Sequence, residues 1–155
     1  MKVAEALALR ADAARRVEQL RTRIVANARF QEGEEPSEDA QALLIEARSV
    51  LDELEVLIRR INRTNAASSM ADGLTLTDAL ARRDMLRSRH SLLTTTADAA
   101  AGRNQLGGRQ LRSELKMLTR LPVARLREQA DAVARELREL DIRIQQTNWE
   151  IDLLD

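Results

Sequence analysis

The chain is organised around residues 61–84, INRTNAASSMADGLTLTDALARRD, where one helical apolar pattern stops and another begins. The first pattern ends within Ile61–Asn65, and Asp72-Gly73 marks the tip of a turn. The second begins at Thr75 or Thr77, and Thr75 as N-cap places Asp78 at the third helical position, an acidic capping box. A short connection of this kind makes successive helices run antiparallel.

Apolar residues that recur at spacings of three and four predict four helices. We expect them over about residues 2–28, over 38–65, from 75 or 77 to near Ala101-Gly102, and from 122 into residues 148–150. Ser37 is the expected N-cap of the second helix, after a loop that contains Gly33 and Pro36. Pro122 is expected at the first position of the fourth helix, where its missing N–H costs nothing.

The second helix has an apolar stripe three columns wide, which belongs inside a bundle rather than in a two-stranded seam. Its columns are Leu44, Leu51 and Ile58; Ala47, Leu54 and Ile61; and Leu43, Val50 and Leu57. The stripe of the third helix contains Ala79, Leu86, Leu93 and Ala100 with Met85, Leu92 and Ala99 alongside. The fourth helix has the most regular heptads, Leu126, Val133 and Leu140 beside Ala130, Leu137, Ile144 and Ile151.

Between residues 103 and 121 the helical period fails. Gly107-Gly108 interrupts the chain, and Leu115, Met117, Thr119 and Leu121 alternate with other residues in a weak strand pattern. Leu118 spoils this alternation, so a short helical turn or an irregular segment is the alternative.

Composition excludes several classes of protein. Without cysteine, the chain has no disulfide, no thiolate metal site and no cysteine nucleophile. The formal net charge is zero, so no global field draws the protein to nucleic acid or to anionic lipid. Charges at Glu5, Arg10 and Asp12 interrupt the segment where a signal peptide would be apolar, and no stretch reaches the ~18 uncharged residues of a membrane span. We expect a soluble, cytoplasmic protein without a membrane partner.

Antiparallel helices of similar length bring the start of the first, the end of the second, the start of the third and the end of the fourth to one end of the fold. The polar residues expected to meet there as a ligand-binding site are Arg10, Asn62, Asn65, Thr75, Asp78, Arg82, Arg83, Asn148 and Trp149. In this interpretation the arginines hold an anionic group, and the asparagines bond neutral groups. The competing interpretation is structural: the same side chains cap helix ends and form ion pairs, and Trp149 covers the core.

No residue pattern predicts catalysis, a metal site or a cofactor. His90 is the single histidine and lies on an apolar stripe four turns along the third helix, where a packed side chain is the ordinary role. No pair of carboxylates has a diagnostic metal-binding spacing. Basic runs such as Arg82-Arg83 share their helices with acids, and aromatic residues for base stacking are nearly absent, which argues against nucleic-acid binding.

The chain resembles the septicolysin-like family of small bacterial proteins over nearly its whole length. The resemblance rests on Met1–Leu7 with Arg10–Asp12, Gln31–Glu34 with Pro36, Ile61–Asn65, Asp72-Gly73 with Thr75–Asp84, and Asn148-Trp149. It implies a protein of long helices without an established biochemical function, and it transfers no catalytic residue. The cytolysin in the family name finds no counterpart here, since a membrane-inserting amphipathic segment and an aromatic belt are missing.

We therefore expect an all-α fold: four long helices in an antiparallel bundle or hairpin arrangement, one domain over residues 1–155, with a short irregular or strand-like segment before the last helix. The wide apolar stripes predict a homo-oligomer, a dimer or higher, with the fourth helix as its interface. The leading function is a non-enzymatic, self-associating scaffold or interaction protein. The first alternative is a small-molecule or metal binding protein, or an enzyme, that uses the polar end. Nucleic-acid binding through arginine-rich helix faces comes third.

Overall fold

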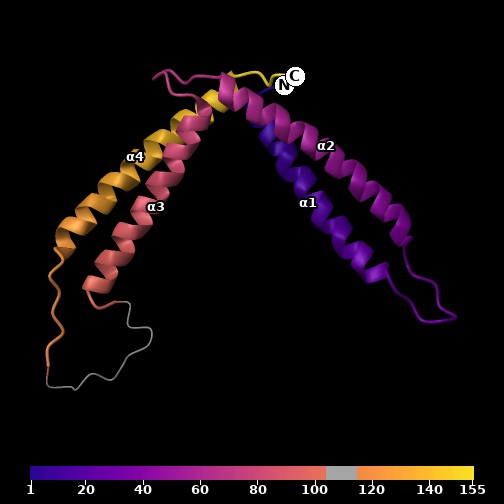
Figure 1. Ribbon diagram of the computed structural model, residues 1–155, viewed down its shortest axis with the longest axis horizontal. Helices are drawn as coiled ribbons and strands as arrows, with labels where there is room; N and C mark the ends of the chain where they lie inside the picture. The colour runs from indigo at the N-terminus through magenta and orange to yellow at the C-terminus, as the bar shows by residue number, and fades with distance from the viewer. Residues whose placement is uncertain (104–114) are drawn as a thin grey trace. The chain divides into compact units, whose positions relative to one another are not determined.

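The computed structural model describes residues 1–103 and 115–155, which contain four α-helices (Figure 1). The helices are α1 (Val3–Asn27), α2 (Ala40–Ala67), α3 (Leu76–Ala100) and α4 (Val123–Glu150). The described residues form no β-strand and only two isolated bridges, Lys2 with Asp152 and Ser69 with Thr75. The predicted all-α fold of four long helices is confirmed.

The chain divides into two compact units. Unit 1 comprises Met1–Thr77 and Gln145–Asp155, and unit 2 comprises Asp78–Ile144. Unit 1 therefore contains α1, α2, the turn before α3, the last residues of α4 and the tail that follows them. Unit 2 contains most of α3 and α4. That residues 1–155 fold as one domain stays a prediction.

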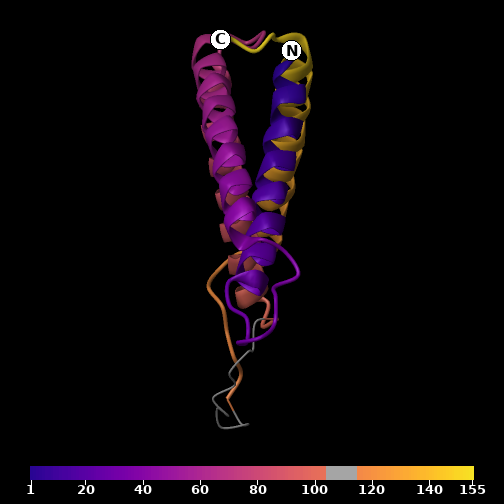
Figure 2. The same ribbon diagram turned by 90° about the vertical axis from the view of Figure 1, so that its right-hand side faces the viewer.

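In unit 1, α1 and α2 form a long antiparallel hairpin. Arg16 pairs with Glu46 at 2.6 Å and Arg23 pairs with Glu38, so residue numbers fall along α2 as they rise along α1. The two helices lie side by side in both views (Figure 1, Figure 2). One hydrophobic cluster comprises Leu20, Leu43, Ala47 and Val50, with Ala13, Val17 and Ile24 packed against it. A second comprises Ala6, Ile61 and Leu153, with Leu7 and Leu57.

The join between α1 and α2 differs from the sequence prediction in its capping residue. Asp39, not Ser37, is the N-cap of α2, and its Oδ1 accepts hydrogen bonds from the backbone N–H groups of Gln41 at 2.8 Å and Ala42 at 3.3 Å. Ser37 Oγ instead donates to Asn27 Oδ1 at 2.9 Å. The end of α1 thereby binds the residues that lead into α2, a long-range contact that local capping rules do not include.

In unit 2, α3 and α4 form a second antiparallel hairpin. Arg82 pairs with Glu136 at 2.6 Å, and Arg127 pairs with Asp98 at 3.4 Å. The buried residues of α4 include the predicted heptad positions Ala130, Val133, Leu140 and Ile144, and those of α3 include Ala79 and Leu86.

The apolar stripe predicted for α3 is wider than the face of α3 that is buried. Met85 and Leu92, expected beside Leu86 and Leu93, are 62% and 67% exposed. A single partner helix covers only a narrow face of α3. Met85 and Leu92 each precede a residue of that face by one position, which places them about 100° away around the helix.

The segment before α4 is irregular where it is described. Leu115, Met117 and Leu118 are each more than 70% exposed, and residues 115–121 form no strand, so the strand prediction is wrong there. A local turn replaces it, because Thr119 Oγ1 accepts a hydrogen bond from the backbone N–H of Leu121 at 3.1 Å. Gly107-Gly108 lies outside the described residues.

Candidate functional site

All four helix ends that the sequence predicted to meet belong to unit 1. The start of α1 reaches the end of α4, where the N–H of Val3 donates to the carbonyl oxygen of Ile151 at 3.0 Å. The end of α2 reaches the start of α3 through the N–H of Leu76 and the carbonyl oxygen of Ser68, also 3.0 Å apart. The tail after α4 reaches α2, since the N–H of Leu154 donates to Thr64 Oγ1 at 3.0 Å.

Thr64 is central to this arrangement. Its side chain is fully buried, accepts from Leu154, and donates to the carbonyl oxygen of Arg60 at 2.8 Å. Thr64 was not among the predicted site residues, although it stands seven residues after Leu57 and so continues an apolar column. A polar residue at a buried heptad position was the signal available.

Arginines of α2 fix the tail further. Arg60 donates from Nε to the carbonyl oxygen of Leu154 at 2.9 Å and pairs with Asp155 Oδ1 at 2.7 Å. Arg63 donates to the Asp155 backbone oxygen at 3.3 Å. These hydrogen bonds hold the last residues against α2.

Lys2 makes the matching contacts at the start of the chain. Its Nζ donates to the carbonyl oxygen of Glu150 at 2.9 Å and lies 3.0 Å from Asp152 Oδ1. Its backbone N–H donates to Glu5 Oε2 at 2.7 Å. Helix ends in unit 1 thus bind one another through the carbonyl and N–H groups that a helix leaves unpaired.

The predicted site residues of unit 1 differ widely in exposure. Asn148 is 5% exposed, Asn65 and Thr75 are half-buried, and Arg10, Asn62 and Trp149 are exposed. Trp149, at 62% exposure, does not cover the core as the structural interpretation required. Thr75 directly precedes α3 and forms a bridge with Ser69.

The other three predicted residues, Asp78, Arg82 and Arg83, belong to unit 2. Arg82 is held by Glu136 of α4. The Arg83 Nε lies 3.3 Å from Asp84 and 4.0 Å from Asp141. Both arginines therefore have carboxylate partners inside their own hairpin, as the ion-pair interpretation expects. That the nine residues form a ligand site stays a prediction.

Within the described residues, every buried side-chain nitrogen or oxygen has a hydrogen-bond partner. The same residues contain no group of three His, Cys, Asp or Glu side chains placed to hold a metal ion. They also contain no helix with the length and apolarity that crossing a membrane requires.

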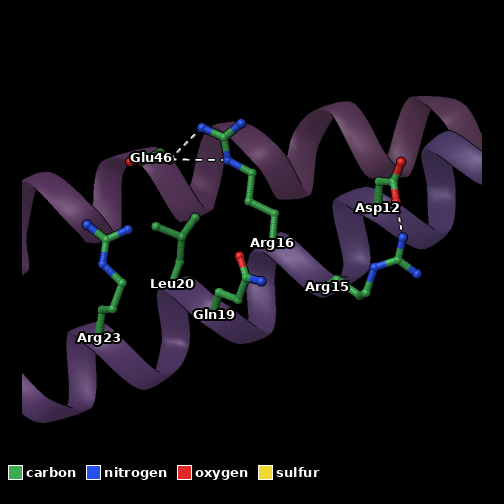
Figure 3. A pocket seen from close by; sticks show the side chains of 7 residues that line it. All are labelled: Asp12, Arg15, Arg16, Gln19, Leu20, Arg23 and Glu46. Atoms are coloured by element: carbon green, nitrogen blue, oxygen red, sulfur yellow. Dashed lines mark hydrogen bonds and ion pairs between the residues drawn. The ribbon is translucent and has the colours of Figure 1, made fainter.

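Two hollows run along the α1–α2 hairpin. The first, about 410 Å³, is lined by arginines that already have carboxylate partners: Arg16 bonds Glu46 and Arg15 bonds Asp12 (Figure 3). The second is a groove of about 530 Å³ with a mainly apolar lining, which includes Leu9, Val56 and Leu57. Neither hollow could be predicted from the sequence, since both depend on how closely α1 packs on α2.

The ion pair between Arg23 and Glu38 joins the end of α1 to the start of α2. A hydrogen bond from the Arg23 guanidinium lowers the pKa of the Glu38 carboxyl below its ordinary value, and the same bond raises the pKa of Arg23. A carboxyl group whose pKa is lower in the folded than in the unfolded state stabilises the folded protein at pH values above its unfolded-state pKa. This stabilisation is lost as the pH falls through the folded-state pKa.

We therefore expect acid to destabilise the wild-type protein more than Glu38→Gln. Between about pH 6 and about pH 3, the Tm of the wild type should fall further than that of the variant, because glutamine at position 38 does not titrate and all other carboxyl groups are shared. Circular dichroism melts at the two pH values measure this difference. Glu35→Gln, in the same loop, serves as the control and should behave like wild type. Equal acid sensitivity of wild type and Glu38→Gln would contradict the assignment.

One apolar column of α2 stays largely open to solvent. Leu44, Leu51 and Ile58 are 41%, 47% and 37% exposed, whereas Leu43, Ala47 and Val50 are buried against α1. We call Leu44, Leu51 and Ile58 the outer face of α2. A single helix packed against α2 covers two of its three apolar columns and leaves the third uncovered.

The protein is thus an all-α protein of antiparallel helical hairpins, with an apolar helix face open on one of them. Residues 10–153 match a family of unknown function, DUF6847, and the chain belongs to this family. It is similar to the crystal structure of a functionally unknown conserved protein from Corynebacterium diphtheriae, with 38% identity, a TM-score of 0.92 and 99% of each chain covered. No curated protein matches the chain. The septicolysin-like resemblance stays a prediction.

Proposed function

We propose that this protein is a non-enzymatic, self-associating scaffold or interaction protein of the cytoplasm, and that the outer face of α2 is its association surface. The observation that carries the proposal is the exposure of Leu44, Leu51 and Ile58 at heptad spacing. Aliphatic side chains in such a row gain free energy when a second helix removes them from water. Isolated exposed apolar residues are ordinary, but a row along one helix face indicates an interface.

This proposal moves the interface from the fourth helix, where the sequence predicted it, to α2. The heptad residues Ala130, Val133, Leu140 and Ile144 of α4 are already buried within the chain. They have no surface left to offer a second copy. The outer face of α2 still has exposed apolar surface.

The dimensions of α2 set the expected strength of association. With 28 residues, the helix is about 42 Å long. A seam roughly 10 Å wide along it would bury on the order of 400 Å² per copy, at the low end for specific interfaces. We therefore expect reversible association rather than a permanent dimer.

Sedimentation velocity of the wild-type protein tests the proposal. Over a hundredfold range of concentration up to roughly 100 µM, the weight-average sedimentation coefficient should rise from the monomer value toward a larger species. High salt should leave the rise largely in place, because apolar burial supplies most of the association free energy. A single monomer boundary at every concentration would refute the proposal.

A further inference from the structure

We infer that two copies of this chain pair antiparallel through the outer faces of α2, with Arg48 of each copy opposite the partner subunit's Glu55. This inference rests on the proposed function and adds the direction of the pair and the residues that select it.

The charges lie beside the apolar row at the same heptad spacing. Arg48 follows Leu44 by four residues, and Glu55 follows Leu51 by four. Residues four apart are neighbours on a helix surface, so Arg48 and Glu55 form one column along the edge of the outer face. Both residues are exposed.

The order of these charges favours antiparallel pairing. When two identical helices pair antiparallel about a two-fold axis, the same edge of each helix meets in the middle and residue numbers run in opposite directions. An axis at the level between Leu51 and Asp52 places Arg48 opposite the partner subunit's Glu55, and the symmetry forms that ion pair twice.

A parallel pair would lack these contacts. A two-fold axis along the helices sets the Arg48–Glu55 edge of one copy against the other edge of its partner. On that other edge α2 carries Ala47 and Leu54, and Ala47 is already covered by α1, so α2 offers these charges no counter-charge there.

The ion pair that Glu55 makes with Arg59 of its own helix does not prevent pairing across the interface. Glu55 lies 3.9 Å from Arg59 on the same helix, and the two side chains are 72% and 61% exposed. Exposed ion pairs of this kind contribute little to the free energy of folding. Glu55 can therefore exchange Arg59 for an arginine of a second copy at a small cost in free energy.

Charge reversal tests the pairing. Arg48→Glu and Glu55→Arg each set like charges opposite one another at two places in the dimer, and each should weaken self-association about tenfold. An equimolar mixture of the two variants should associate like wild type, because the mixed dimer again pairs opposite charges at both places. Glu53→Arg is the matched control: it makes the same charge change in the groove lining, away from the outer face, and should leave association unchanged.

Cysteine cross-linking tests the direction independently, since the chain has no cysteine of its own. Leu51→Cys lies next to the proposed axis and should form an intermolecular disulfide under mild oxidation. Leu44→Cys should not, because fifteen residues separate its level from that of its own copy, about 22 Å along the helix. Efficient cross-linking at both positions would establish a parallel pair and overturn the inference.

The outcomes separate the two claims. A wild-type protein that stays monomeric removes the proposed function and the inference together. A wild-type dimer that neither single charge reversal weakens, and that mixing the variants does not affect, overturns only the antiparallel pairing. Circular dichroism of each variant shows that loss of association is not loss of fold.

Discussion

Leu51→Glu is expected to abolish self-association while leaving the α1–α2 hairpin folded. Leu51 is the middle residue of the outer face and is 47% exposed, so a glutamate there can reach water in the monomer. In the dimer, the carboxylate would lose water near the same carboxylate of the partner, with no counter-charge provided. We expect association to weaken at least roughly a hundredfold, as for other charges placed unpaired in an interface.

Val56→Glu is the matched control for this variant. Val56 lies on the same helix with a similar exposure of 54%, but it lines the groove and does not belong to the outer face. Sedimentation velocity should show Val56→Glu associating like wild type and Leu51→Glu as a monomer, with equal helix content by circular dichroism. Undiminished association of Leu51→Glu would exclude the outer face as the interface.

Leu20→Ala is expected to cause the largest loss of folding stability. Leu20 is 1% exposed and packs with Leu43, Ala47 and Val50 between the helices of the hairpin. Removing this buried side chain costs about 2–5 kcal/mol, and two helices have few other layers of core to compensate. For a chain of this size, a loss near 3 kcal/mol lowers Tm by roughly 10 °C.

Leu9→Ala removes the same atoms from the same helix at a position that is 50% exposed, and it should cost less than about 1 kcal/mol. Urea titrations at one fixed protein concentration provide the comparison, since self-association would add to the apparent stability. Similar losses for the two variants would contradict the hairpin core described above.

The helices could be predicted from the sequence because each carries its own period and its own boundary signals. The predicted bounds lie within two residues of the observed ones for α1, α2 and α4, and α3 begins directly after Thr75. Gly102, with a φ of 76°, follows the end of α3 as predicted. The N-cap of α2 was misassigned because Ser37 and Asp39 are both good capping residues, and only the long-range bond to Asn27 separates them.

The candidate site could be predicted only in part. Antiparallel connection placed the four helix ends in one neighbourhood, and their hydrogen bonds in unit 1 agree with that expectation. The contacts themselves depend on backbone groups. The N–H of Leu154 donates a hydrogen bond, and the carbonyl oxygens of Glu150 and Leu154 accept one, whatever side chain the residue carries. The pattern of side chains in the sequence therefore does not predict these backbone partners.

The long helices and their antiparallel connections follow from the amino-acid sequence alone, because apolar period, glycine, proline and capping residues act over a few neighbouring positions. The three apolar columns of α2 follow from the sequence as well. Which columns are covered depends on the packing of the helices: Leu43, Ala47 and Val50 pack on α1, and Leu44, Leu51 and Ile58 stay open. One neighbouring helix can cover only part of the circumference of another, and a periodic sequence pattern does not specify which part.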